Sequence, residues 1–416
     1  FVGFPGIVYN AGLPGIWSVF LYPIGIYVGV LLCLRLVSNS GNQFGSRSIP
    51  EYLGIRYQSP WIRILVSIFS LSLFFYLAGQ LVSGIVMFEI MLGVPKMAAL
   101  ILTSVVLLIY VVLGGAHADI LTDGVQGFIM VGVGVLVAVL FCLGYGIEGG
   151  FDGMISALGS QDENLVGWLN VTDVLYHSWW AVFAVFLAHV PLGMLPHIGN
   201  KLWALKEPTQ RMQFIRLAFV FALILAMLGF GGIMARVILG EGIDSNQALA
   251  LLFIDLFPSW FAALLGVGIL AAVMSTADGL ILAIANAISH DVYYKIIDPK
   301  AETAKRLVVA RVLLVVIGFA GATIAAMEIQ GILGSVIWAF DFAMSGLFFP
   351  LVLGVWWKRA NREGAIAGMA LGLISGAGYL IWVRNGGSGF LGITQLTFGI
   401  FGSAVSLVAM VVVSLM

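Results

Sequence analysis

Residues 271–279 read Ala-Ala-Val-Met-Ser-Thr-Ala-Asp-Gly, which places two hydroxyl groups and a carboxylate inside a segment otherwise apolar enough to span a bilayer. Polar groups in hydrocarbon cost several kcal/mol unless something binds them. On a helix, Ala272, Ser275 and Thr276 lie at positions i, i+3 and i+4, so one backbone carbonyl and two hydroxyl oxygens can face one small cation. The stretch therefore predicts a membrane helix that carries an oxygen-lined site of sodium size.

The composition of the chain excludes an ordinary soluble domain. Of its 416 residues, 61% are hydrophobic and 9% are charged, and the mean hydropathy is +1.09. A soluble domain typically carries about 25% charged residues. We therefore expect an all-α polytopic membrane protein whose surroundings are a lipid bilayer. The formal net charge of −1 gives no reason to expect a nucleic-acid partner.

Eleven apolar runs are candidates for crossing the bilayer, which takes roughly 20 residues each. A half-length apolar piece, residues 1–10, precedes them. Because the chain begins at Phe1 without Met and inside this piece, we expect that an N-terminal segment is missing. The runs are 13–37, 61–92, 97–113, 119–146, 178–195, 210–239, 258–288, 304–327, 334–356, 364–383 and 389–416.

Basic residues gather on one set of alternate loops, and the opposite set holds only isolated ones. By the positive-inside rule the basic loops are cytoplasmic, and the C-terminal helix then ends in the cytoplasm. We expect a multi-pass protein of the plasma membrane, of a bacterial inner membrane in particular. The basic residues of the first set are Arg47, Arg56, Arg63, Lys201, Lys206, Arg211, Lys295, Lys300, Lys305, Arg306, Lys358, Arg359 and Arg362.

Two spans contain helix-breaking residues at membrane depth. Residues 3–6 read Gly-Phe-Pro-Gly, and residues 189–193 read His-Val-Pro-Leu-Gly. Proline and glycine free backbone groups that only a polar cavity can satisfy. If the first partial helix is counted, the breaks lie in spans one and six, which is the pattern of two inverted five-helix repeats. Ordinary kinks, which are common in membrane helices, are the alternative.

Seven stretches distributed over the whole chain match, in order, sequence motifs of a known protein family. They are Phe1-Val-Gly-Phe-Pro-Gly6, Ser48-Ile-Pro-Glu-Tyr-Leu-Gly-Ile-Arg-Tyr57, Gly114 to Gln126, Leu195-Pro-His197, Ala271 to Asp278, Ile288-Ser-His-Asp-Val-Tyr293 and Trp357-Lys-Arg-Ala-Asn361. In these stretches the chain resembles the sodium:solute symporter family, whose members include bacterial carriers of proline, pantothenate, acetate, sialic acid and galactose.

The resemblance implies a LeuT-type fold, with a ten-helix core of inverted repeats plus extra C-terminal helices. It places a truncated first repeat at residues 1–146, the second repeat at 178–357 and the additional helices at 364–416, all within one transport domain, 1–416. It also implies that the N-terminal helix and the inner half of core helix one are missing. That half normally supplies two backbone carbonyls to the main sodium site.

The resemblance assigns the main Na⁺ site to Ala272, Ser275 and Thr276. The alternative is that both hydroxyls only back-bond to a carbonyl of the preceding turn, as often happens in membrane helices. A second cation or proton site would involve Asp123, Ser275 and Asp278, although the two-sodium pattern of the family has serines where this chain has Asp278 and Gly279. Two carboxylates there could strengthen a cation site or share a proton. The structural alternatives are a helix cap for Asp123 and a satisfied buried acid for Asp278.

Substrate ligands are expected at the two helix breaks and nearby. Gly3 and Pro5 lie at the first break and His189 beside the second, whereas Gln80 matches a glutamine of pantothenate- and acetate-type carriers. A glutamine amide can bind a carboxylate without burying a charge of its own. Asp341, in core helix ten, is a further acidic residue within a span. It is a candidate substrate ligand because ionisable residues inside spans are costly and usually functional.

These observations predict a sodium-coupled symporter that imports a small organic anion, a monocarboxylate or pantothenate-like, by alternating access. No catalytic constellation or phosphate-binding loop is visible in the sequence, so we expect neither an enzyme nor an organic cofactor. A monomer would suffice for transport. The alternatives are a proline, amino-acid or sugar symporter, a proton-coupled variant, and the membrane module of a sensor.

Overall fold

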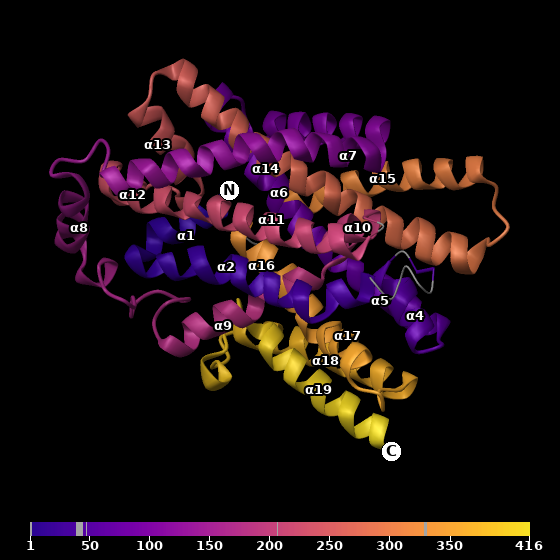
Figure 1. Cartoon of the computed structure of the whole chain (residues 1–416). Helices are drawn as coiled ribbons and strands as arrows, with labels where there is room; N and C mark the ends of the chain where they lie inside the picture. The colour runs from indigo at the N-terminus through magenta and orange to yellow at the C-terminus, as the bar shows by residue number, and fades with distance from the viewer. Residues whose placement is uncertain (1, 39–44, 47, 206, 328–330) are drawn as a thin grey trace.

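The structure is a computed structural model that describes residues 2–38, 45–46, 48–205, 207–327 and 331–416, with the backbone alone at 115–119, 200 and 204. The described residues form helices and connecting segments, without a strand (Figure 1). The helices are α1 (Gly3–Ala11), α2 (Ile16–Gly29), α4 (Ile49–Arg56), α5 (Pro60–Phe69), α6 (Leu73–Leu92), α7 (Lys96–Leu143), α8 (Gly150–Gln161), α9 (Trp179–His189), α10 (Pro196–Ala204), α11 (Pro208–Ala226), α12 (Phe230–Ile238), α13 (Ala248–Leu256), α14 (Ser259–Asn286), α15 (Thr303–Ala326), α16 (Ile332–Gly346), α17 (Phe348–Trp356), α18 (Arg362–Arg384) and α19 (Phe398–Leu415).

The predicted membrane spans are confirmed. Within the described residues, nine helical runs are long and apolar enough to cross a membrane, and two bent helix pairs raise the number to as many as eleven. Each of the eleven predicted runs has its counterpart among them. The runs end within a few residues of the prediction at most boundaries, for example Leu13–Ser38 for 13–37 and Pro60–Leu92 for 61–92. The all-α polytopic fold class is therefore correct.

The long helix α7 contains two antiparallel spans rather than one. The hydroxyl groups of Tyr110 and Thr122 are in contact, although residues twelve apart on a straight helix would lie about 18 Å apart along its axis. The chain must therefore reverse between them. Lys96–Gly114 and Ile120–Leu143 accordingly qualify as separate spans, which agrees with the two predicted runs there.

The predicted break near residues 189–193 is confirmed. Helix α9 ends at His189, a short turn η5 (Pro191–Met194) follows, and the chain then bends by 50° into α10. At this turn the backbones of α2 and η5 nearly touch, because a β-carbon on Gly193 would lie 2.0 Å from the carbonyl oxygen of Ile26. Residues 3–6 behave differently, since they form the beginning of α1 rather than a break within a helix.

A second bend, of 46°, divides the predicted run 334–356 into α16 and α17. Pro350 lies in the first turn of α17. Proline has no N–H, so it cannot donate to the carbonyl of residue 346, and its ring clashes with that carbonyl. The helix therefore cannot run straight through this point, which the hydropathy of the run does not reveal.

Charge is distributed between the two ends of the bundle as predicted. In Figure 1, α4, α10 and the turn between α14 and α15 lie at one end, and α8 and α13 lie at the other. The first end carries Arg56, Lys201 and Lys295, and the C-terminus of α19 lies toward it. Two basic residues of the predicted set, Arg47 and Lys206, are outside the described residues, as is Phe1.

Candidate functional site

A cavity of about 370 Å³ lies in the middle of the bundle, where α1, α2, α6, α9, α14 and α16 meet. Most of its wall is apolar, from side chains such as Phe4, Ile26 and Phe340. A small set of polar groups interrupts this wall, which is typical of a binding site for a small organic molecule. The polar residues are Ser18, Tyr22, Tyr76, Gln80, Ser83, His189, Ser275 and Thr276.

The predicted sodium ligands Ala272, Ser275 and Thr276 all line this cavity. Thr276 Oγ1 donates to the carbonyl oxygen of Ala272 at 3.1 Å, and Ser275 Oγ donates to the same oxygen at 3.4 Å. The structure thus contains the back-bonded arrangement and also brings three oxygens together at a cavity wall. Because a hydroxyl hydrogen rotates to suit its surroundings, the same oxygens can turn to a bound cation.

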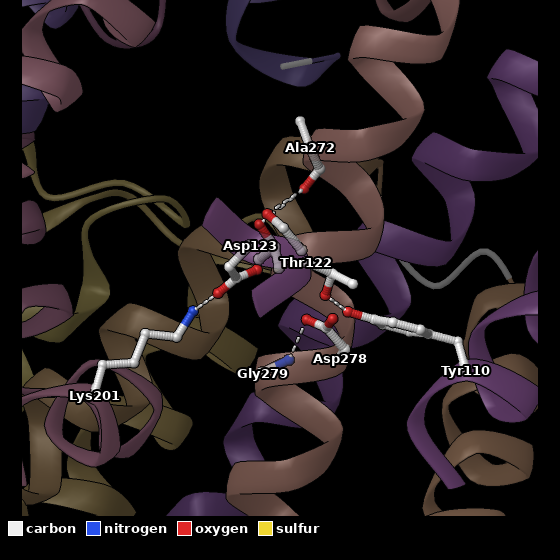
Figure 2. A network of polar contacts seen from close by, with 9 residues as sticks. Tyr110, Thr122, Asp123, Lys201, Ala272, Asp278 and Gly279 are labelled. Atoms are coloured by element: carbon white, nitrogen blue, oxygen red, sulfur yellow. Dashed lines mark hydrogen bonds and ion pairs between the residues drawn. The ribbon is translucent and has the colours of Figure 1, made fainter. Parts of the chain in front are cut away.

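Beside these oxygens lies a second polar group, formed where α7 packs against α14. Figure 2 shows the Thr122 hydroxyl in contact with that of Tyr110, with Asp123 and Asp278 in the same network of polar contacts. Asp278 is fully buried, and its Oδ1 accepts the N–H of Gly279 at 2.6 Å. The structure therefore brings the two predicted acids, Asp123 and Asp278, into one region.

Asp123 has a basic partner that the sequence did not predict. The ammonium group of Lys201, on α10, donates to Asp123 Oδ2 (Figure 2). Both side chains are partly shielded from solvent, with exposed fractions of 33% for Lys201 and 18% for Asp123. Because 78 residues separate them, no local pattern in the sequence relates one to the other.

Of the predicted substrate ligands, Gly3, Gln80 and His189 line the cavity. His189 Nδ1 lies 2.6 Å from the carbonyl oxygen of Val185. A carbonyl can only accept, so this nitrogen carries the proton, and a neutral His189 then offers Nε2 to the cavity as an acceptor. Its ring also packs edge-on against Tyr22, with 4.9 Å between the ring centroids.

The other two predicted substrate ligands do not line the cavity. The carbonyl oxygen of Pro5 faces α12, where a β-carbon on Gly232 would lie 2.0 Å from it. Asp341 is fully buried between α16 and the first turn of α19, where its Oδ1 would lie 2.7 Å from a β-carbon on Gly399. A helix N-terminus favours a carboxylate, so the first turn of α19 is a favourable surrounding for the Asp341 side chain.

A polar cluster at the basic end joins two of the stretches singled out in the sequence. Ser48 Oγ donates to Asp291 Oδ1 at 2.7 Å, and it also caps the N-terminus of α4 by accepting the N–H of Glu51. Lys295 Nζ lies 2.7 Å from Glu51 Oε1, and His290 Nε2 lies 3.6 Å from Glu51 Oε2. These contacts fasten α4 to η8 (Ala287–Ile297), the π-helix that continues α14.

The comparisons with known proteins agree on one family. The model of the sodium:solute symporter family matches residues 1–372. The sodium/pantothenate symporter of Escherichia coli (strain K12) is 26% identical over 385 residues, which cover 89% of this chain and 77% of that protein. The sodium/proline symporter of the same strain is 27% identical over 421 residues, covering 97% of this chain and 80% of that protein.

A solved structure shares the fold. It is the substrate-bound, outward-open state of a Na⁺-coupled sialic acid symporter, with a TM-score of 0.75 and 17% sequence identity, and the match covers 99% of this chain and 85% of that one. At this identity the similarity shows the fold alone. The predicted LeuT-type architecture, with helices added after the core, is thereby confirmed.

Proposed function

The chain belongs to the sodium:solute symporter family, and on that premise we propose that it imports a small organic anion, a monocarboxylate or pantothenate-like acid, together with sodium. The family and the relatives are sodium-coupled transporters, so the protein is a multi-pass membrane transporter and not an enzyme. The observation that carries the proposal is the placement of Ala272, Ser275 and Thr276 in the wall of the cavity that Gln80 also lines.

Sodium binds first in the proposed cycle. An extracellular Na⁺ between α1 and α14 stabilises the outward-open state and completes the substrate site beside it. The bundle then rocks and exposes both ligands to the cytoplasm. One sodium ion that enters with one monovalent anion moves no net charge, so the inward sodium concentration gradient drives accumulation of the solute without ATP. Each tenfold sodium gradient is worth about 1.4 kcal/mol.

The proposed orientation follows from charge. The end of the bundle that carries α4, α10 and η8 is cytoplasmic in this proposal, and so is the C-terminus, because that end holds most of the basic residues. Residues 1–146 and 178–357 are assigned to the two inverted repeats, and 364–416 to the added helices. The membrane is the plasma membrane.

The chemistry of the cavity wall supports an anion more than an amino acid. Among the described residues, no Lys, Arg, Asp or Glu lines the cavity. An amino acid such as proline would bring an ammonium group that meets no carboxylate there, and burying an unpaired charge is costly. A carboxylate can instead accept hydrogen bonds from Gln80 and the hydroxyl groups while the coupled sodium ion supplies the positive charge. Proline remains the second candidate because a sodium/proline symporter is among the relatives.

Thermal unfolding of the full-length protein tests this substrate class. With sodium present, acetate or pantothenate is expected to raise the unfolding temperature more than proline or galactose does, because a ligand at 100 times its Kd stabilises by about 2.7 kcal/mol. Without sodium the shift should be much smaller.

The variant Gln80→Ala sharpens this experiment. Losing one hydrogen bond to a charged group costs about 1.5–3 kcal/mol. The carboxylate concentration that gives the same rise in unfolding temperature should therefore increase roughly 10-fold or more. Gln213→Ala, an exposed glutamine on α11, is the matched control and should behave as the wild type. Stabilisation by proline, with none by any carboxylate, would exclude the proposed substrate class.

A further inference from the structure

Lys201 connects the second half of a broken span to the acidic region beside the sodium ligands. It lies on α10, after the 50° bend that follows η5, and its ammonium group contacts Asp123 at the start of the second span of α7. The contact therefore ties the half-helix α10 to the polar network that Figure 2 shows, of which Asp278 on α14 is also a part. A carboxylate at this point is already paired with a positive charge that belongs to the chain itself.

An ammonium group can take the place of a sodium ion beside the Asp123 carboxylate. It carries the same single charge, it is compact, and its three N–H groups take carboxylate and hydroxyl oxygens as partners. Its flexible four-carbon stem lets it reach the site while the backbone stays on another helix. A free sodium ion beside it would meet a like charge within contact distance of the same carboxylate, and that repulsion disfavours joint occupancy.

The charges of the region balance with one sodium ion. Asp123 and Asp278 together carry two negative charges when ionised, and Lys201 carries one positive charge. A single sodium ion at Ala272, Ser275 and Thr276 then brings the total to zero. Before the substrate binds, a second sodium ion would therefore leave a net positive charge in this region, where uncompensated charge is expensive.

We propose that the ammonium group of Lys201 fills the second cation position beside Asp123, so that the protein binds one sodium ion and not two. This inference rests on the proposed sodium-coupled function and specifies the number of coupling ions.

Equilibrium binding of radioactive ²²Na⁺ to the purified full-length protein, without any substrate, tests the inference. Wild type should bind one ion per chain. Lys201→Gln removes the tethered charge, and the vacated position beside Asp123 should then take a second ion, giving two per chain. Lys201→Arg keeps a cation and should stay at one. Lys358→Gln, which removes an exposed charge that lies outside the cavity wall, is the control and should also stay at one.

Other variants separate the two positions. Adding Asp123→Asn to Lys201→Gln should return the count to one, because the ligand of the second ion is lost. Two ions bound to wild type, or one ion bound to folded Lys201→Gln, would overturn the inference and leave the proposed sodium coupling intact. The absence of sodium binding in wild type would overturn the proposed function, and this inference with it. The wild-type count tests the inference even if Lys201→Gln does not fold.

Discussion

Replacing Ser275 and Thr276 together by alanine is expected to raise the sodium concentration needed for half-maximal uptake on the order of 100-fold. Both hydroxyl oxygens lie within 3.4 Å of the Ala272 carbonyl oxygen at the cavity wall. If each lost oxygen costs about as much as a hydrogen bond to a charged group, about 1.5–3 kcal/mol, the double variant loses about 3 kcal/mol or more. The substrate concentration at half-maximal uptake, measured in saturating sodium, should change far less.

Uptake measured against sodium concentration gives the result directly. Thr323→Ala is the matched control, because Thr323 Oγ1 donates to the carbonyl oxygen of Phe319 at 2.9 Å in the same back-bonded way but is exposed on α15. Its sodium dependence should equal that of wild type. An unchanged sodium dependence in the double variant would remove both hydroxyls from the site and leave back-bonding as their whole role.

Gly193→Ala is expected to prevent transport by disrupting the bundle itself. A β-carbon at this position would lie 2.0 Å from the carbonyl oxygen of Ile26 and 2.8 Å from the backbone nitrogen of Val30. Both contacts are with backbone atoms of the span Leu13–Ser38, so no side chain can move aside. Overpacking usually costs about 1–3 kcal/mol, and a backbone clash should reach about 3 kcal/mol or more. Gly29, on the other side of the contact, is equally crowded, with the Val190 carbonyl oxygen at 2.0 Å.

Thermal unfolding and uptake of the purified variant measure this effect. Gly132→Ala is the control, since Gly132 is also helical but a β-carbon added there would meet no other atom within 4 Å among the described residues. It should be neutral or slightly stabilising, because alanine favours a helix over glycine by roughly 1 kcal/mol. Wild-type stability and uptake in Gly193→Ala would mean that the close approach of α2 and η5 is not needed for the fold.

Most of the fold could be predicted because a membrane span depends on local features of the sequence. Run 61–92 needs only its length and hydropathy to be recognised, and Pro191 and Gly193 indicate the break after His189. The 46° bend between α16 and α17 is not predicted, since Pro350 falls inside an apolar run that looks continuous. The short helix α13 is not predicted either, because nine residues are too few to span a bilayer.

The candidate site could be predicted where its residues share one helix and not where they come from several. Ala272, Ser275 and Thr276 are related by helical spacing alone, and the structure places them in one wall. The pairing of Lys201 with Asp123 depends on the tertiary placement of α10 relative to α7, which no periodicity encodes. Asp341 was a candidate because acids are rare within spans. Only the packing of α16 against α19 shows that it lies outside the cavity.

Uptake into proteoliposomes that contain the full-length protein tests sodium coupling most directly. The solute is the carboxylate that stabilises the protein best, and external sodium is replaced by choline at the same membrane potential and without a pH gradient. Sodium coupling predicts rapid accumulation in sodium, and uptake in choline no greater than that of protein-free liposomes. Accumulation in choline that a pH gradient drives, with no response to sodium, would contradict sodium coupling and point to protons instead.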